Sequence, residues 1–303
     1  MSRSVILASI ASAVFALTPL ASDVAGIKAG RIDAASYDFG PLRQQSNLLD
    51  PLRTWSETVP GARGRARGPW ETCGSNRQAR YVRAWTNVPS TMSAEDYGRA
   101  RRAVVDEMRD LEAKARSADL DARSTAHTPV EQQLAGLAAA DQIWMGEALL
   151  NWSNPDEATT KLFAAVLEAR ACDFEWKEAR ALRRILRTVR WPGIKTYSAE
   201  ASENAWLIAQ HVDHDLPLQS LALQRLEAAV AEGQAKPEHY AYLADRVAIS
   251  SGHPQRFGTQ LRCLNGKTVP APLLDAAHVD DARRAYGLPP LAQYLKGFDR
   301  PCR

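Results

Sequence analysis

The 303-residue chain lacks the motifs that assign many enzymes to a reaction at first sight. It contains no Gly-x-Ser-x-Gly nucleophile motif, no phosphate-binding P-loop and no His-Glu-x-x-His zinc motif. Its formal net charge of only +3 gives no reason to expect a nucleic-acid partner. These absences argue against serine hydrolases of that motif, P-loop nucleotide enzymes and zincin metalloproteases, and they leave the substrate open.

Long apolar runs are also scarce, and the clearest one lies near the N-terminus. Arg3 precedes the run 5–17, and Leu20-Ala21-Ser22 supplies small residues after it. This order is typical of a secretory signal peptide, and the run is shorter than the roughly 20 residues of a membrane span. We therefore expect a signal peptide over residues 1–22 and export to the periplasm or extracellular space, with an uncleaved anchor as the alternative. No later segment is apolar enough to predict an integral membrane domain.

Cysteine is sparse, with four residues in the chain: Cys73, Cys172, Cys263 and Cys302. An even number of cysteines in an exported chain predicts disulfides, and four cysteines allow three pairings. We favour Cys263–Cys302, which would join the tail to the domain, and by default Cys73–Cys172. Because no CxxC or CxxxxC spacing occurs, a zinc knuckle is not expected. We assign no cofactor and no metal ligands. Whether any metal binds stays open, and Asp141, His239 and Asp245 would be the candidates for further ligands.

The chain divides by composition. Residues 23–90 are rich in Gly, Pro, Ser and Arg and have little periodicity, which predicts a weakly structured leader, with partial packing as the alternative. Arginine is dense within 62–83; a solvated linker is the main interpretation, and contact with an anionic envelope partner is the alternative. Helical spacing of apolar residues then predicts a helical extension over 91–130 and an α-helical domain over 131–303.

The expected fold class is mainly α, with one small β-hairpin near 257–270. Thr128-Pro129-Val130-Glu131 has the pattern of a capping box with proline in the first turn, which predicts a helix start. Asn265-Gly266 between short apolar runs predicts a type I′ hairpin turn. Further helices are expected at about 93–120, from 154 through 169, and at 174–189, 199–212, 216–232, 237–249 and 279–286.

The second half carries a series of landmarks in order along the chain: Asp141-Gln142, Trp191-Pro192-Gly193, Ala205-Trp206-Leu207, 210–215, 242–247, 254–260, Asn265-Gly266-Lys267, Val279-Asp280, Arg283 and 287–290. These landmarks resemble those of DUF6624, a bacterial domain family of unknown function. The resemblance covers about residues 132–295 and implies a fold and a polar site, but no particular reaction. Arg190 replaces a glycine of the family pattern, and Phe257 replaces a tyrosine. Glu175 and Glu178 stand where the pattern has an Asp and an Asn, so an activity that needs those two residues would be altered here.

The sequence Gln210-His211-Val212-Asp213-His214-Asp215 concentrates polar groups after an apolar run. On a continuous helix, His211, His214 and Asp215 would share a face, which is a spacing able to bind metal. Val212 occupies the position of the zincin glutamate, so we favour a site without metal. We interpret His214 as solvated and Asp215 as a helix cap. His211 is either a hydrogen-bonded core residue or a general base.

Two further segments carry candidate site residues. Asp245-Arg246 lies in an apolar helical pattern, so it is either a structural ion pair or an arginine presented to an anionic ligand group and oriented by Asp245. The segment 255–260 is rich in amides, which suit recognition of a peptide, a sugar or a nucleotide edge. The alternative is a turn whose amides satisfy backbone groups.

The leading hypothesis is an exported protein of hydrolase-type acid–base chemistry, acting on a small-molecule, peptide or glycan ligand. His211 would be the base, Asp213 or Asp215 would orient it, and Arg246 would bind an anionic group. The alternatives are a non-catalytic envelope module that binds a peptide or glycan, and a purely structural protein. The predicted catalytic residues are His211, Asp213 and Asp245; the predicted ligand-binding residues are Asp141, Gln142, Gln210, Arg246, Gln255, Thr259 and Gln260. The oligomeric state stays open.

Overall fold

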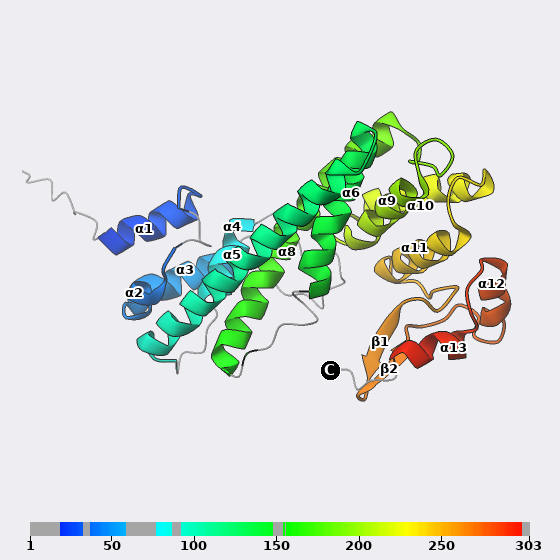
Figure 1. The fold of residues 1–303 in the computed structure, drawn as a ribbon. Coiled ribbons are helices and arrows are strands. Elements are labelled where there is room, and N and C mark those ends of the chain that lie inside the picture. The colour runs from blue at the N-terminus through cyan, green and yellow to red at the C-terminus, as the bar shows by residue number, and fades with distance from the viewer. Residues whose placement is uncertain are drawn as a thin grey trace, which may run out of the picture.

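The computed structural model describes residues 19–32, 37–58, 77–86, 92–147, 154 and 156–298. In this part of the chain the fold is mainly α with one two-stranded antiparallel sheet, as the sequence predicted. Figure 1 shows two long helices running side by side, with short N-terminal helices at one end and the remaining helices at the other. No helix of the described residues is both long and apolar enough to span a membrane.

The N-terminal helices pack against the two long helices. The elements are α1 (Pro19–Lys28), α2 (Gly40–Arg43), α3 (Ser46–Thr58), α4 (Arg77–Thr86), α5 (Ala94–Ser124) and α8 (Glu157–Thr188). They share one apolar core, in which Ile27, Phe39, Leu52, Trp85 and Phe163 are almost fully buried. The prediction of weak structure over 23–90 is therefore wrong for the described residues of that range, because their apolar side chains find partners on α5 and α8. The domain boundaries stay predictions.

Helix α1 contains the predicted cleavage zone. Leu20 packs against the apolar core and Ile27 lies within it. Residues 1–18 lie outside the described residues, and the signal peptide stays a prediction. Cys73 and Cys302 lie outside them as well; Cys172 and Cys263, which are described, are not free thiols. The pairing of the cysteines stays a prediction.

A second core holds the elements that follow. These are α6 (Pro129–Asp141), a π-helical turn η2 (Gln142–Glu147), α9 (Ala199–His211), α10 (Leu216–Ala231) and α11 (Pro237–Ser250). They bury Leu134, Ile208, Leu226 and Leu243 against the C-terminal half of α8. Helix α8 thus belongs to both cores. The sequence predicted two helices in its place, but no Gly or Pro interrupts Glu157–Thr188, so the helix continues.

Local capping signals were reliable. Thr128 and Glu131 form the predicted capping box at the start of α6. Ser93 caps α5, and Asp215 accepts a hydrogen bond from the backbone N–H of Leu218 at the start of α10. Asp156 caps α8 by accepting from the backbone N–H of Thr159, so the helix begins at Glu157 and not at the predicted 154.

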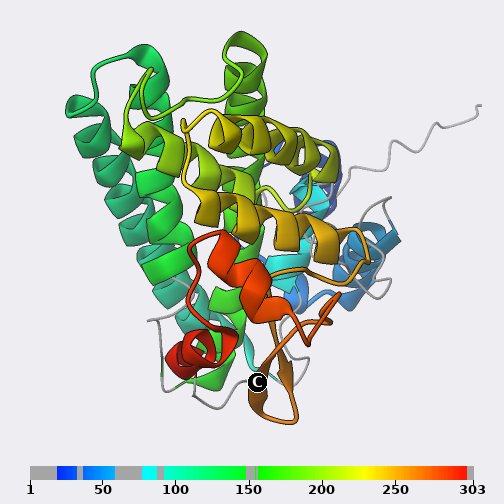
Figure 2. The ribbon, with the colours of Figure 1, turned by 90° about the vertical axis from the view of Figure 1, so that its right-hand side faces the viewer.

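The C-terminal elements fold back onto α11 (Figure 2). They are β1 (Leu261–Leu264), β2 (Lys267–Pro270), α12 (Val279–Ala285), α13 (Leu291–Leu295) and η3 (Lys296–Phe298). Asn265 and Gly266 both have positive φ, at 52° and 75°, as the predicted type I′ turn requires. The hairpin begins at Leu261 and not near Phe257, because the backbone of 256–259 binds to α11 instead.

Candidate functional site

His211 is the last residue of α9, and its ring is held by a buried carboxylate. His211 Nδ1 lies 2.8 Å from both carboxylate oxygens of Asp141, at the end of α6. Asp141 is fully buried, whereas the His211 side chain is 19% exposed. Because a carboxylate only accepts, Nδ1 carries the proton, and Nε2 is the ring nitrogen left able to accept one. Nε2 makes no hydrogen bond within the described residues.

The orienting carboxylate is therefore neither Asp213 nor Asp215, which the sequence suggested. Asp215 caps α10 and forms an ion pair with Arg183. Gln142, predicted to bind ligand, donates to Asp141 Oδ2 at 2.9 Å and so supports the same carboxylate.

Arg246 is held by two groups from the end of α9. Its Nε donates to Gln210 Oε1 at 3.0 Å, and its Nη1 donates to Asp213 Oδ2 at 2.9 Å. The other oxygen of Asp213 accepts from Gln219 Nε2 at 2.9 Å. Asp213, predicted to be catalytic, thus positions the arginine. The guanidinium is fixed before any ligand arrives, which lowers the entropy lost on binding.

Asp245 serves the neighbouring loop and not Arg246. It is fully buried and accepts from the backbone N–H groups of Arg256, Phe257 and Thr259, at 2.8–3.2 Å, and from the Thr259 hydroxyl at 2.9 Å. Gln255 completes the loop by bonding Gln260 and the carbonyl oxygen of Ala271. The geometry gives Asp245 the role of a loop anchor and offers no access for the predicted catalytic role.

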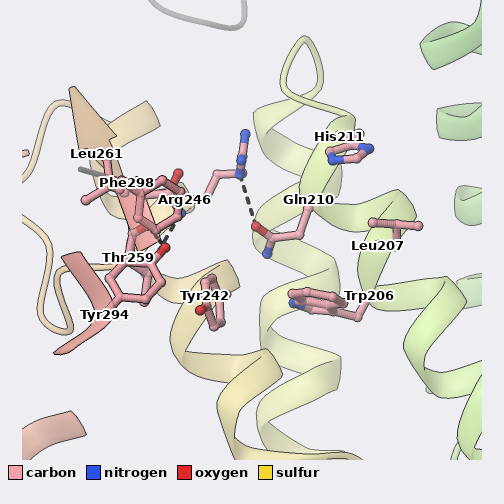
Figure 3. A pocket seen from close by; sticks show the side chains of 11 residues that line it. Trp206, Leu207, Gln210, His211, Tyr242, Arg246, Thr259, Leu261, Tyr294 and Phe298 are labelled. Atoms are coloured by element: carbon pink, nitrogen blue, oxygen red, sulfur yellow. Dashed lines mark hydrogen bonds between the residues drawn. The ribbon is translucent and has the colours of Figure 1, made fainter. Parts of the chain in front are cut away.

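These residues surround an open pocket of about 390 Å³ (Figure 3). Five predicted site residues line it, namely Gln210, His211, Arg246, Thr259 and Gln260. Asp141, Asp213, Asp245 and Gln255 lie behind them and hold them in place. Four aromatic residues also line the pocket: Trp206, Tyr242, Tyr294 and Phe298. The sequence analysis had not assigned them to the site.

A family model described as "Family of unknown function (DUF6624)" matches residues 129–300, more than half of the chain. The chain belongs to the DUF6624 family. The match begins at α6 and includes every residue that lines the pocket. No curated protein and no solved structure matches the chain.

The DUF6624 domain also buries a carboxyl group that the sequence had not placed in the site. Glu178 of α8 is fully buried, and neither of its oxygens has a hydrogen-bond partner within the described residues. Burial, together with the charges of Asp141 and Glu175, raises the pKa of the Glu178 carboxyl well above its usual value. The sequence offered one signal for this site: Glu178 stands at a position where the family pattern has a different polar residue.

His214 is not solvated, contrary to the sequence-based interpretation. Its side chain is 1% exposed, with Nδ1 3.5 Å from Glu175 Oε2 and its ring 4.6 Å from the ring of Trp176. The face that His211, His214 and Asp215 would share does not form, because α9 ends at His211. Among the described residues, no group of three or more His, Cys, Asp and Glu side chains is arranged to hold a metal ion.

Proposed function

We propose that the DUF6624 domain of this chain is an acid–base catalytic domain of hydrolase type. The observation that carries the proposal is the Asp141–His211 pair, whose histidine reaches an open pocket. His211 Nε2 would take a proton from an attacking water and return it to the leaving group. The buried carboxylate of Asp141 would hold the ring and stabilise the imidazolium between these two steps. Arg246 would bind an anionic group of the substrate.

The test is a screen of chromogenic esters, amides, glycosides and phosphoesters with wild type and His211→Ala. The matched control is His253→Ala, which changes an exposed histidine outside the pocket. Circular dichroism shows whether each variant is folded. Turnover that is lost in His211→Ala and kept in His253→Ala supports the proposal. Turnover that survives in a folded His211→Ala variant contradicts it.

The aromatic wall favours a second candidate, a non-catalytic module for a peptide or glycan. Trp206, Tyr242 and Tyr294 offer ring faces of the kind that bind sugars and apolar side chains. Saturable binding of a ligand that the protein leaves unchanged would support this candidate over the enzyme.

We also propose that the protein is exported to the periplasm or the extracellular space. The N-terminal charge and apolar pattern supports this proposal, as does the absence of free thiols among the described cysteines. N-terminal sequencing of protein expressed with its leader tests it. A new N-terminus near residue 22 is expected, and an intact Met1 in a soluble intracellular fraction would contradict export.

A further inference from the structure

Two N–H donors on the pocket side of α9 have no acceptor in the part of the chain that the structure describes. Gln210 Nε2 and Trp206 Nε1 are both buried and make no hydrogen bond within the described residues. The two residues are four positions apart on one helix, so they lie on the same face, and both line the pocket. A buried donor without an acceptor is unfavourable, and such a group in a native structure calls for an explanation.

Arg246 decides which end of the Gln210 amide faces outward. A guanidinium only donates, so the amide group 3.0 Å from Arg246 Nε must be the oxygen. The amide nitrogen must then point away from Arg246. Figure 3 shows it directed toward the space between Trp206 and Tyr242. The amide is thus held with its oxygen on Arg246 and its nitrogen turned toward the aromatic side of the pocket wall.

The charged groups around these donors favour a ligand with a single negative charge. Arg246 lines the pocket, and no Asp or Glu does. Asp213 lies behind Arg246 and already balances part of its charge, with both of its oxygens bonded to Arg246 and Gln219. A doubly charged phosphate would be poorly balanced here, because the charge of Arg246 is already partly neutralised by Asp213. A carboxylate matches both this charge and the set of donors.

We propose that Arg246, Gln210 and Trp206 form a subsite for a carboxylate group, with Tyr242, Tyr294 and Phe298 contacting an adjoining ring or apolar group of the same ligand. A peptide C-terminus and a sugar acid share this chemistry. The inference rests on the pocket of the proposed function, but it does not require His211 to act as a base.

The experiment measures binding of matched ligand pairs to the full chain by isothermal titration calorimetry. One pair is N-acetylphenylalanine and its amide, for a peptide source, and the other is glucuronic acid and glucose, for a sugar source. Phenyl phosphate tests the competing anion. At least one carboxylate should bind about tenfold more tightly than its neutral partner, as a charge-assisted contact requires.

Two variants and one control assign the effect to the subsite. Arg246→Gln should abolish the preference for the carboxylate. Trp206→Phe keeps a ring but removes the N–H, and it should reduce that preference by weakening binding of the carboxylate more than binding of its neutral partner. Arg262→Gln, an exposed arginine on β1 that does not line the pocket, should change nothing.

Several outcomes overturn the inference: neutral ligands that bind as tightly as carboxylates, tighter binding of phenyl phosphate, no binding of either carboxylate at millimolar concentration, or a preference that survives in Arg246→Gln. His211→Ala separates the two proposals. If carboxylate binding persists and no substrate is ever turned over, the subsite stands and the enzyme proposal fails. If turnover depends on His211 but no carboxylate is preferred, the reverse holds.

Discussion

Replacing Asp245 by alanine should destabilise the protein by about 3–5 kcal/mol, a large loss for one side chain. Asp245 accepts from four donors, three backbone N–H groups and the Thr259 hydroxyl, and it is fully buried. Hydrogen bonds to a charged acceptor contribute roughly 1.5–3 kcal/mol each, so four give an upper bound of about 6–12 kcal/mol. The expected loss is smaller because the freed loop can shift and admit water.

The assay is urea unfolding followed by circular dichroism. Asp245→Asn keeps one acceptor oxygen, so it should lose roughly half as much stability as Asp245→Ala. Amide hydrogen exchange should accelerate at 256–259 in both variants, since the carboxylate bonds the backbone there. The control is Asp281→Ala, which removes an exposed pair with Arg284 and should change stability by less than about 0.5 kcal/mol.

The result that would refute the reasoning is a folded Asp245→Ala variant within about 1 kcal/mol of wild type. If that variant also lost turnover or ligand binding, the catalytic role suggested by the sequence would return. A loss of stability that Asp245→Asn partly rescues would instead establish the loop anchor.

Three further predictions concern the site and its helices. Because the pKa of Glu178 is raised in the folded state, its contribution to stability is complete below about pH 4.5 and is lost as pH rises toward the folded pKa. Wild type should therefore lose up to about 1.4 kcal/mol per pH unit relative to Glu178→Gln in that window, and parallel pH–stability curves from thermal unfolding would contradict this. Thr128→Ala should cost about 1 kcal/mol in chemical unfolding by removing the cap of α6, while exposed Thr125→Ala serves as its control. Asp141→Asn should lower any His211-dependent kcat by at least about 100-fold with a smaller change in KM, because the amide cannot favour the same tautomer or stabilise an imidazolium; an unchanged kcat would remove Asp141 from the mechanism.

Much of the fold could be predicted because its signals are local. The capping box at Thr128 and the Asn265-Gly266 turn depend on residues within a few positions of each other. The prediction was wrong where packing outweighed composition. The composition of residues 37–58 and 77–86 predicted a weakly structured leader. In the structure, Phe39, Leu52 and Trp85 are instead buried against α5 and α8.

The sequence predicted which residues belong to the candidate site better than it predicted the role of each residue. Gln210, His211 and Arg246 do meet at one pocket, which the grouping of polar residues suggested. Their partners were assigned from neighbours in the sequence, and the structure assigns different ones. Tyr294 and Phe298 line the pocket from short C-terminal helices, and nothing in the local sequence indicated this.

The sequence by itself determined most of the helical segments after residue 92, where several of them begin, and that the chain carries DUF6624 landmarks, because these properties depend on short-range spacing and side-chain type. Only the tertiary structure decided which carboxylate bonds His211 and which one bonds Arg246. Asp141 reaches His211 across 70 residues and Asp213 reaches Arg246 across 33, because α6, α9 and α11 pack with those ends together. Asp213 is closer to His211 in the sequence than Asp141 is, but it bonds Arg246 because α9 ends at His211. Packing in three dimensions therefore sets the chemistry of the site.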